Sequence, residues 1–211
     1  MSNLESKGNS LAFTIDPAPL ALGGFALTTF LLSSITSGLV SITVMPAVVA
    51  VAWFYGGIIQ VLVGLWELAH QRLFQAVTFG SYGAFWLSFA AFQTFFEGKI
   101  PAADLGTANA LFLGVWVVFT FYMLIASFRT NVALVIAFIL VEVLLIPSAI
   151  GFATNNLVAL HFGGWAGIVL AIVVWYVAAA DVINHQFKRT ILPLGNLNQA
   201  PKAKTAMSLP A

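Results

Sequence analysis

Six long apolar segments follow one another along this chain and are separated by short polar connections. They cover residues 17–35, 43–69, 73–96, 105–128, 132–152 and 157–182. A helix that crosses the hydrocarbon layer of a membrane needs about 20 mainly apolar residues, which is the length scale of each segment. The runs are continuous and lack the alternation of membrane β-barrels, so they favour helices. The sequence therefore predicts an all-α integral membrane protein of six transmembrane helices.

The composition agrees with a protein that is dissolved in lipid. Hydrophobic residues make up 61% of the chain and charged residues only 7%, whereas a soluble domain carries about 25% charged residues. The net charge is +1 and no large basic cluster occurs, which argues against nucleic acid as a partner. The chain has no cysteine, which excludes disulfides, iron–sulfur clusters and thiolate zinc sites. We expect no cofactor and no bound metal.

The chain divides into a tail of residues 1–15, a six-helix domain of residues 16–183 and a tail of residues 184–211. The N-terminus does not read as a secretory signal, so we expect the first helix to be retained. With six spans, both ends lie on one side, and the end of the C-terminal tail is expected to be disordered. That side carries Lys7, Arg72, Arg129, Lys188, Arg189, Lys202 and Lys204, and the other carries only Lys99. This asymmetry predicts cytoplasmic termini.

Ionisable residues inside apolar segments are the first functional candidates. Glu67 lies near the end of the second segment, Glu142 in the middle of the fifth, and Asp181 at the end of the sixth. Glu67 and Asp181 either reach the membrane interface or line a polar path, and Glu142 is expected to be protonated or hydrogen-bonded. Asp16 either caps the first helix, with Pro17 at the first helical position, or acts at a pore mouth. No Lys or Arg lies within a span, so the sequence predicts no fixed cation for an anion.

The second segment has one polar face. Gln60, Gly64 and Glu67 are spaced by four and three residues, which places them on one side of a helix. Leu62 and Leu65 lie on the opposite side and are expected to contact lipid. A small polar face of this kind lies inside a helical bundle, either as packing or as the lining of a pore.

Five motifs occur in order along the predicted helices. They are Asp16-Pro17-Ala18-Pro19-Leu20 with Phe25, Thr28 and Thr29; Phe54-Tyr55-Gly56-Gly57 with Gln60, Gly64 and Glu67; Ser81-Tyr82-Gly83 with Phe85-Trp86; His161-Phe162 with Gly164-Trp165; and Asn184, Phe187, Arg189 and Leu192-Pro193. With these motifs the chain resembles the acetate uptake transporters, which include the bacterial succinate–acetate permeases. The resemblance extends from Asp16 to Gly195. Asp16 and Ala21 depart from the Asn and Gly of the family's Asn-Pro-Ala-Pro-Leu-Gly-Leu signature.

The resemblance implies a channel-like subunit of a prokaryotic inner membrane, with a pore inside each protomer of a homo-oligomer, commonly a hexamer. It implies passage of acetate and sometimes succinate, with protons as a coupled partner. By motif position, the family's apolar constriction falls on Phe25, Tyr82 and Val141. The remaining candidates for the substrate path are Asp16, Thr28, Gln60, Glu67 and Glu142. Val141 is smaller than the family's Leu and lies beside Glu142, so a wider and more polar throat is expected to admit acids larger than acetate as well.

Three alternatives stay open at this point. A secondary symporter with alternating access would be favoured by discontinuous helices, for which Pro19 and Pro147 are the candidate break points. A haem-bearing redox subunit would need two histidines at one depth, but His70 and His185 are predicted at one edge and His161 near the other. A purely structural membrane protein would not need polar faces inside the bundle. No nucleophile–base pair is evident, so the sequence does not suggest an enzyme.

Overall fold

The computed structural model describes residues 16–197. The N-terminal tail and the predicted disorder at the end of the C-terminal tail lie outside the described residues. So do Lys7, Lys202 and Lys204, which contributed to the predicted charge asymmetry. Within residues 16–197 the chain is almost entirely helical and forms no β-strand beyond an isolated bridge between Asn131 and Asn196.

Six helical stretches cover the six predicted segments, which confirms the predicted all-α fold. They are α1 (Ala18–Thr36); η1 (Ile42–Val44), α2 (Met45–Val51), η2 (Ala52–Ile59) and α3 (Gln60–Ala69); α4 (Leu73–Ala91) with η3 (Phe92–Phe96) and η4 (Glu97–Lys99); α5 (Leu105–Ser127); α6 (Val132–Thr154); and α7 (Leu157–Phe187). Five of these stretches are long and apolar enough to cross a membrane by length and composition. The α4 helix, which continues as the π-helix η3, supplies the sixth stretch.

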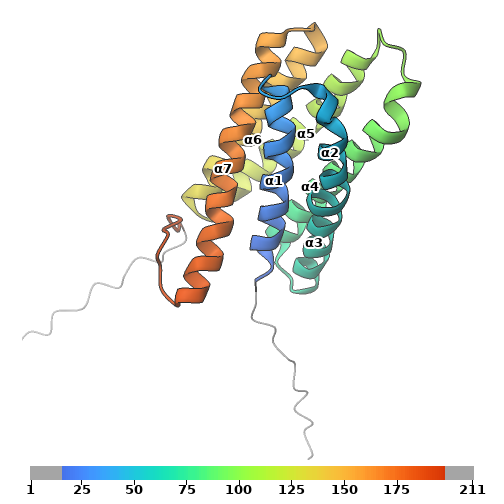
Figure 1. The fold of residues 1–211 in the computed structure, drawn as a ribbon. Helices are drawn as coiled ribbons and strands as arrows, with labels where there is room; N and C mark the ends of the chain where they lie inside the picture. Colours follow the sequence, from blue (N-terminus) through green and yellow to red (C-terminus); the bar gives the residue numbers. More distant parts are fainter. Residues whose placement is uncertain (1–15, 198–211) are drawn as a thin grey trace, which may run out of the picture.

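The helices form a bundle in which neighbours along the chain are mostly neighbours in space (Figure 1). The α7 helix packs between α1 and α6, α5 packs on α6, and α3 packs on α4. The start of α1, the end of α7 and the α3–α4 turn lie at the same end of the bundle (Figure 1). We call this the terminal end. It carries Arg72, Arg129, Lys188 and Arg189, whereas Lys99 lies at the opposite end.

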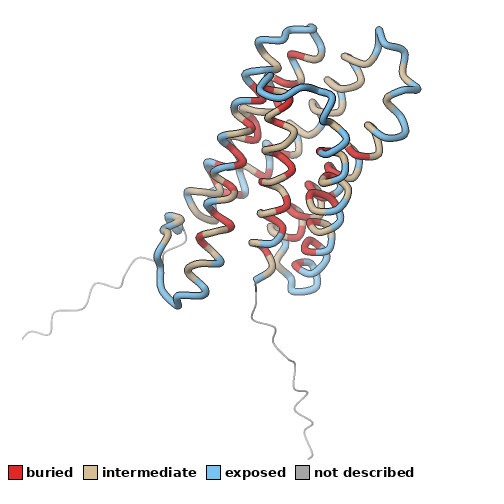
Figure 2. The backbone as a smooth tube through the Cα atoms, viewed as in Figure 1, coloured by how far each residue is buried: buried red, intermediate tan, exposed pale blue. Residues whose placement is uncertain are grey.

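Burial follows the interior of the bundle, and large apolar side chains cover its outside (Figure 2). The α5 helix is the most exposed of the long helices, with a row of exposed apolar side chains: Leu111, Val115, Val118, Phe121 and Ile125. Gln60 and Glu67 are fully buried, whereas Leu62 and Leu65 are more than half exposed, which confirms the predicted polar face of the second span. An exterior this apolar is suited to lipid.

The α3 and α4 helices approach one another so closely that only glycine fits between them. A Cβ atom at Gly64 would lie 2.5 Å from the Gly80 nitrogen, and one at Gly83 would lie 2.7 Å from the Val61 nitrogen. Small residues allow this close backbone packing in membranes, where no hydrophobic force drives helices together. Gly64, on the polar face that it shares with Gln60 and Glu67, therefore allows α3 to pack closely against α4.

The N-terminus of α1 differs by one residue from the prediction. The helix begins at Ala18, and Pro17 rather than Asp16 occupies the N-cap position. Asp16 still serves the helix end, because its Oδ1 accepts a hydrogen bond of 2.9 Å from the Ala18 nitrogen. Asn156 caps the last helix, since its side chain accepts hydrogen bonds from the backbone nitrogens of Val158 and Ala159.

Neither proline suggested as a helix break interrupts its helix. Pro19 lies in the first turn of α1, where a backbone N–H would have no partner within the helix, and α6 continues through Pro147. The irregular span is instead the second one, in which the π-helix η2 separates α2 from α3. The expectation of breaks at these two prolines is therefore wrong.

The α7 helix extends beyond the predicted span, and the residues after it fold back onto the bundle. The Asn184 side chain accepts hydrogen bonds from the backbone nitrogens of Ile191 and Leu192 and donates one to the Leu192 carbonyl. The Gly195 carbonyl then accepts a hydrogen bond from the Val132 nitrogen at the start of α6. The first part of the C-terminal tail is thus an ordered strap at the terminal end.

Candidate functional site

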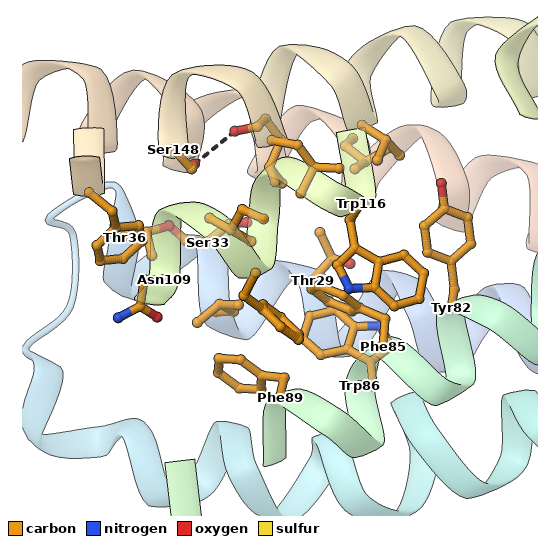
Figure 3. Close-up of a pocket in the computed structure, with 18 of the residues that line it drawn as sticks. Thr29, Ser33, Thr36, Tyr82, Phe85, Trp86, Phe89, Asn109, Trp116 and Ser148 are labelled. Atoms are coloured by element: carbon orange, nitrogen blue, oxygen red, sulfur yellow. Dashed lines mark hydrogen bonds between the residues drawn. The ribbon is translucent and has the colours of Figure 1, made fainter. Parts of the chain in front are cut away.

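A cavity of about 160 Å³ opens in the half of the bundle away from the terminal end (Figure 3). We call it the distal cavity. Residues of α1, α4, α5 and α6 line it, among them Phe25, Thr29, Tyr82, Trp86, Trp116 and Val141. Every described residue that lines it is uncharged, and aromatic and aliphatic side chains predominate. The cavity therefore offers a small solute an apolar space with few polar contacts.

The three residues of the predicted constriction meet at this cavity. Phe25 and Tyr82 pack edge to face, with ring centroids 5.4 Å apart. Val141 lines the same cavity and belongs to the same buried cluster. The Tyr82 hydroxyl lies 2.9 Å from the Thr120 hydroxyl on α5, and this hydrogen bond fixes the position of the ring.

A second cavity of about 450 Å³, which we call the proximal cavity, lies at the terminal end. Polar and charged residues contribute to its lining, including Asp16, Gln75, Arg129, Asn131 and Asp181. On α1 the two cavities are separated by less than one turn, since Leu22 lines the proximal and Phe25 the distal cavity.

The residues between the two cavities form an apolar layer, which we define as Phe25, Tyr82, Phe138, Val141 and Val174. All except Phe25 are buried, and Phe25 packs against the same cluster. Phe138 lies between Leu134 in the proximal and Val141 in the distal lining. The layer separates the proximal cavity, which has charged residues in its lining, from the distal cavity, whose described lining is uncharged.

An ion cluster stands at the terminal end beside the proximal cavity. Arg72, in the α3–α4 turn, lies 3.2 Å from Glu67 Oε2 and 3.6 Å from Asp16 Oδ1. The Glu67 side chain is fully buried, and a buried carboxylate needs such a counter-ion to be tolerated. Glu67, predicted for the substrate path, lines neither cavity and holds this cluster together. Sequence reasoning missed the pairing, although Arg72 follows Glu67 by only five residues.

Two other predicted path residues use their polar groups within their own helices. The Thr28 hydroxyl donates to the Gly24 carbonyl at 2.8 Å, and the Gln60 amide donates to the Gly56 carbonyl at 2.6 Å. Both are bonds to the preceding helical turn, which satisfy a polar side chain without a partner from another helix. Thr28 and Gln60 line neither cavity.

Glu142 occupies an unusual position in α6. The residue is 8% exposed, lies beside Val141, and lines neither cavity. Neither carboxyl oxygen has a hydrogen-bond partner within residues 16–197. The carboxyl is thus buried next to a layer residue of α6 without a hydrogen-bond partner among the described residues.

Thr29 and Trp86 are among the residues of the distal cavity that sequence reasoning missed. Both had been noted only as parts of motifs, yet each follows a constriction residue by four positions, Phe25 and Tyr82 respectively. Residues four apart share one helix face, so the constriction assignment already contained the signal that would have placed them beside it.

An apolar exterior and six membrane-length helical stretches define an integral membrane protein built as a helical bundle. Residues 7–199 match the GPR1/FUN34/yaaH family, and the chain belongs to that family. The resemblance to the acetate uptake transporters is thereby confirmed. Membership in a family with bacterial transporters also supports the predicted multi-pass protein of the inner membrane.

Individual relatives match most of this chain, but the chain spans only part of the length of some of them. The succinate-acetate/proton symporter SatP of Escherichia coli (strain K12) is 36% identical over 182 residues, which cover 85% of this chain and 95% of SatP. Ammonia transport outward protein 2 of Saccharomyces cerevisiae is 35% identical over 176 residues, or 81% of this chain, and the match spans only 62% of the yeast protein. The solved structure of the bacterial acetate channel SatP has a TM-score of 0.80 and 35% identity, and the match covers 86% of this chain and 99% of that one.

Proposed function

We propose that this chain conducts acetate and other small carboxylic acids, including succinate, across the membrane through a pore within each protomer. The observation that carries the proposal is the meeting of Phe25, Tyr82 and Val141 between two cavities of a single protomer. The SatP relatives, named for acetate and succinate, support the choice of solute. The role proposed is transport without catalysis.

The apolar layer is the barrier in this proposal. A carboxylate that enters it without hydrogen-bond donors loses several kcal/mol of hydration, on the order of what an unpaired polar group costs in an apolar medium. A small organic acid with a pKa near that of Glu, about 4–5, is less than about 1% neutral at pH 7. The acid therefore crosses either as the scarce neutral form or as an anion that meets donors at both edges of the layer. Weak binding at those edges suits rapid passage.

The decisive assay is solute flux into proteoliposomes, comparing acetate, succinate, lactate and bicarbonate over a pH series. We expect Val141→Leu to slow succinate and lactate more than acetate, because it narrows the layer. Phe25→Ala should admit all four acids with less discrimination. Leu62→Ala, on the lipid-facing side of α3, is the matched control. Unchanged selectivity in both layer variants would contradict the assignment of the constriction.

We take the mode of transport to be channel-like in this proposal, because the two cavities of one protomer are separated by a single apolar layer. The alternative is a proton symporter of the same acids, the activity for which the Escherichia coli relative is named. Flux that rises linearly with acetate and moves no fixed number of protons supports the channel. Saturating flux with a fixed proton-to-acid ratio supports the symporter.

Ammonia export is a second candidate, because the yeast relative is named for it. The same proteoliposomes can be loaded with ammonium chloride and followed with a pH-sensitive dye. Movement of ammonia without flux of any carboxylic acid would replace the proposed function. Acid flux with no ammonia movement above that of empty liposomes would reject the second candidate.

We propose that Glu142 tunes passage through the layer, since its carboxyl is buried beside Val141 without a partner among the described residues. Glu142→Gln keeps the shape of the side chain and removes its ability to ionise. An altered rate or pH dependence of acetate flux supports the proposal. Flux that matches the unmodified protein at every pH assigns Glu142 a structural role.

We propose cytoplasmic termini and a homo-oligomer, with a hexamer expected from the family resemblance. Four described basic residues at the terminal end against one at the other support the orientation. The exposed apolar row of α5 supports a subunit boundary along that helix. Since the chain has no cysteine, Asn196→Cys tests the orientation with a membrane-impermeant thiol reagent, and Val118→Cys tests the boundary by cross-linking. Native mass spectrometry gives the number of subunits.

A further inference from the structure

The proximal cavity has an exposed rim and a buried inner end. Asp16 at the start of α1, Arg129 in the α5–α6 turn and Asn196 of the strap are exposed residues of its lining. We call these three residues the rim. Leu22 and Val177 also line the cavity, and both are buried in the apolar cluster of the bundle. The rim therefore marks the mouth of the cavity at the terminal end, and the strap, residues 188–197, supplies part of it.

Two α7 side chains attach the first half of the strap, which runs from the end of α7 to the α5–α6 turn (Figure 1). Asn184 accepts hydrogen bonds of 2.6 and 3.0 Å from the Ile191 and Leu192 nitrogens and donates one of 2.8 Å to the Leu192 carbonyl. The Tyr176 hydroxyl donates one of 2.8 Å to the Pro193 carbonyl. The strap is thus attached to α7 before it reaches the rim.

The second half of the strap pairs with the start of α6. The Gly195 carbonyl accepts a hydrogen bond of 2.9 Å from the Val132 nitrogen. The Leu194 carbonyl accepts one of 3.2 Å from the Ala133 nitrogen, and the Leu194 side chain packs on the buried cluster. Both nitrogens lie in the first turn of α6, where backbone N–H groups have no partner within the helix. Detaching the strap would therefore expose apolar surface and leave two backbone donors unpaired.

Gly195 allows the strap to approach α6 this closely. Its φ is +72°, in the left-handed region that is unfavourable for a residue with a Cβ atom. A Cβ atom at this position would also lie 2.9 Å from Val132 Cγ2. The next residue, Asn196, lines the cavity and forms a β-bridge with Asn131. The backbone of the strap thus holds Asn196 at a defined place in the rim.

We propose that the strap is a fixed rim that sets the upper size limit of the solute admitted to the proximal cavity, with Asn196 as the residue that narrows the mouth. The proposal rests on the proposed function and adds a steric selection at the terminal end of the path. The cavity volume of about 450 Å³ far exceeds the roughly 30 Å³ of one liquid water, so selection by size falls to the mouth. The strap acts by excluding longer acids and not by binding short ones, and it stays in place during passage.

The first test measures the width of the mouth and needs no transport. Since the chain has no cysteine, Leu22→Cys places a single thiol at the buried inner end of the cavity. Its modification rate in lipid nanodiscs is compared for methyl and benzyl methanethiosulfonate, each divided by the rate of that reagent with glutathione. We expect the benzyl reagent to react at least tenfold more slowly than the methyl reagent. Equal normalised rates would overturn the proposal.

Substitutions at Asn196 change the rim without changing the backbone hydrogen bonds of the strap. In the Leu22→Cys background, Asn196→Ala should raise the normalised rate of the benzyl reagent several-fold, because it shortens the side chain at the mouth. Asn196→Phe should lower that rate, because it enlarges the side chain. Gly98→Ala is the matched control at the other end of the bundle, where a Cβ atom meets nothing within 4 Å. A benzyl rate that is the same in both Asn196 variants rejects Asn196 as the narrowing residue.

Two further variants loosen the strap itself. Gly195→Ala should raise the benzyl rate about tenfold, the order of the left-handed penalty for a residue with a Cβ atom. Asn184→Ala removes three hydrogen bonds of the strap and should act in the same direction. Asn184→Asp keeps the acceptor for the Ile191 and Leu192 nitrogens and should restore most of the discrimination. A benzyl rate that is unchanged in both Gly195→Ala and Asn184→Ala overturns the proposal.

A disulfide tests whether the strap stays in place during passage. Asn131 and Asn196 lie opposite each other, and the backbone hydrogen bonds join the residues on either side of them. The Cα atoms of such a pair are about 4.5 Å apart, which a disulfide can span. Acetate flux through Asn131→Cys/Asn196→Cys is measured with the disulfide formed and after reduction, with mass spectrometry verifying both states. Equal flux supports a fixed rim, and flux that appears only after reduction overturns it in favour of a moving gate.

The rim and the proposed function can fail separately. Acetate flux together with modification rates that do not depend on reagent size rejects the rim and leaves the proposed function standing. Size-dependent modification of Leu22→Cys that responds to the strap variants, in a protein that passes none of the acids tested, rejects the proposed function and leaves the rim standing.

Discussion

The distal and proximal cavities lie on either side of one apolar layer and differ in whether charged residues line them. The proximal cavity includes Asp16, Arg129 and Asp181 in its lining, beside the ion cluster of Arg72 and Glu67. The distal cavity is lined by uncharged residues and holds two buried polar groups without partners. The difference is that charged groups gather at the terminal end, whereas the described lining of the distal side offers a solute only neutral hydrogen-bonding groups.

The largest effect is expected from a substitution in the ion cluster beside the proximal cavity. Arg72→Ala leaves the fully buried Glu67 carboxylate without its counter-ion, which costs about 3 kcal/mol, at the lower end for broken buried pairs because Arg72 is partly exposed. We expect a large drop in Tm of the detergent-solubilised protein. Lys188→Ala, at an exposed position, serves as the control.

A second substitution tests whether the unpaired charge of Glu67 causes the loss of stability. Glu67→Gln in the Arg72→Ala background removes the unpaired charge, so part of the lost Tm should return. If Arg72→Ala melts at the temperature of the unmodified protein, the ion cluster does not stabilise the terminal end.

A single carboxylate tests the uncharged character of the distal cavity. Asn109→Asp adds one negative charge to its lining, and Asn131→Asp adds the same charge to the proximal lining, where two carboxylates already stand. Repulsion of about 1 kcal/mol should reduce acetate flux about fivefold for the distal variant. The proximal variant should change flux less, and equal effects of the two substitutions would remove the proposed asymmetry.

The smallest effect is expected from neutralising a charge at the proximal mouth. Asp16→Asn keeps an acceptor for the Ala18 nitrogen and removes one negative charge that an approaching anion meets. Acetate flux should rise about twofold at low salt and return toward the unmodified value near 1 M salt, where charges are screened within about 3 Å. A gain that persists at high salt would assign the effect to something other than charge.

The fold could be predicted from the sequence because lipid imposes a simple length rule. Each predicted segment coincides with a helical stretch, and α5 was placed to within one residue of its end. The burial of Gln60 and Glu67 was also predictable. Their spacing places them on one face of the helix with Gly64, so the opposite, apolar face is the one that contacts lipid. The family motifs supplied Phe25, Tyr82 and Val141, which physical reasoning on one sequence alone does not single out.

The roles of individual polar residues were harder to predict. Hydropathy shows that a helix lies in the membrane. It gives little information on the rotation of the helix about its own axis, because the sides that face lipid and neighbouring helices are both apolar. Thr28 and Gln60 look like donors for a solute in the sequence, yet both bond to their own helices. The pairing of Glu67 with Arg72 depends on the turn that brings the arginine back, and a hydropathy profile contains no such geometry.

The central claim is that solute passes through the apolar layer, and the absence of cysteine from the chain allows a direct measurement. Val141→Cys places one thiol in the layer, and acetate flux is measured before and after reaction with a small neutral methanethiosulfonate reagent. Leu62→Cys, on the lipid-facing side, is treated identically, and mass spectrometry verifies the modification of both. We predict that modification stops acetate flux at position 141 and leaves it intact at position 62. Full acetate flux through protein modified at position 141 would contradict it.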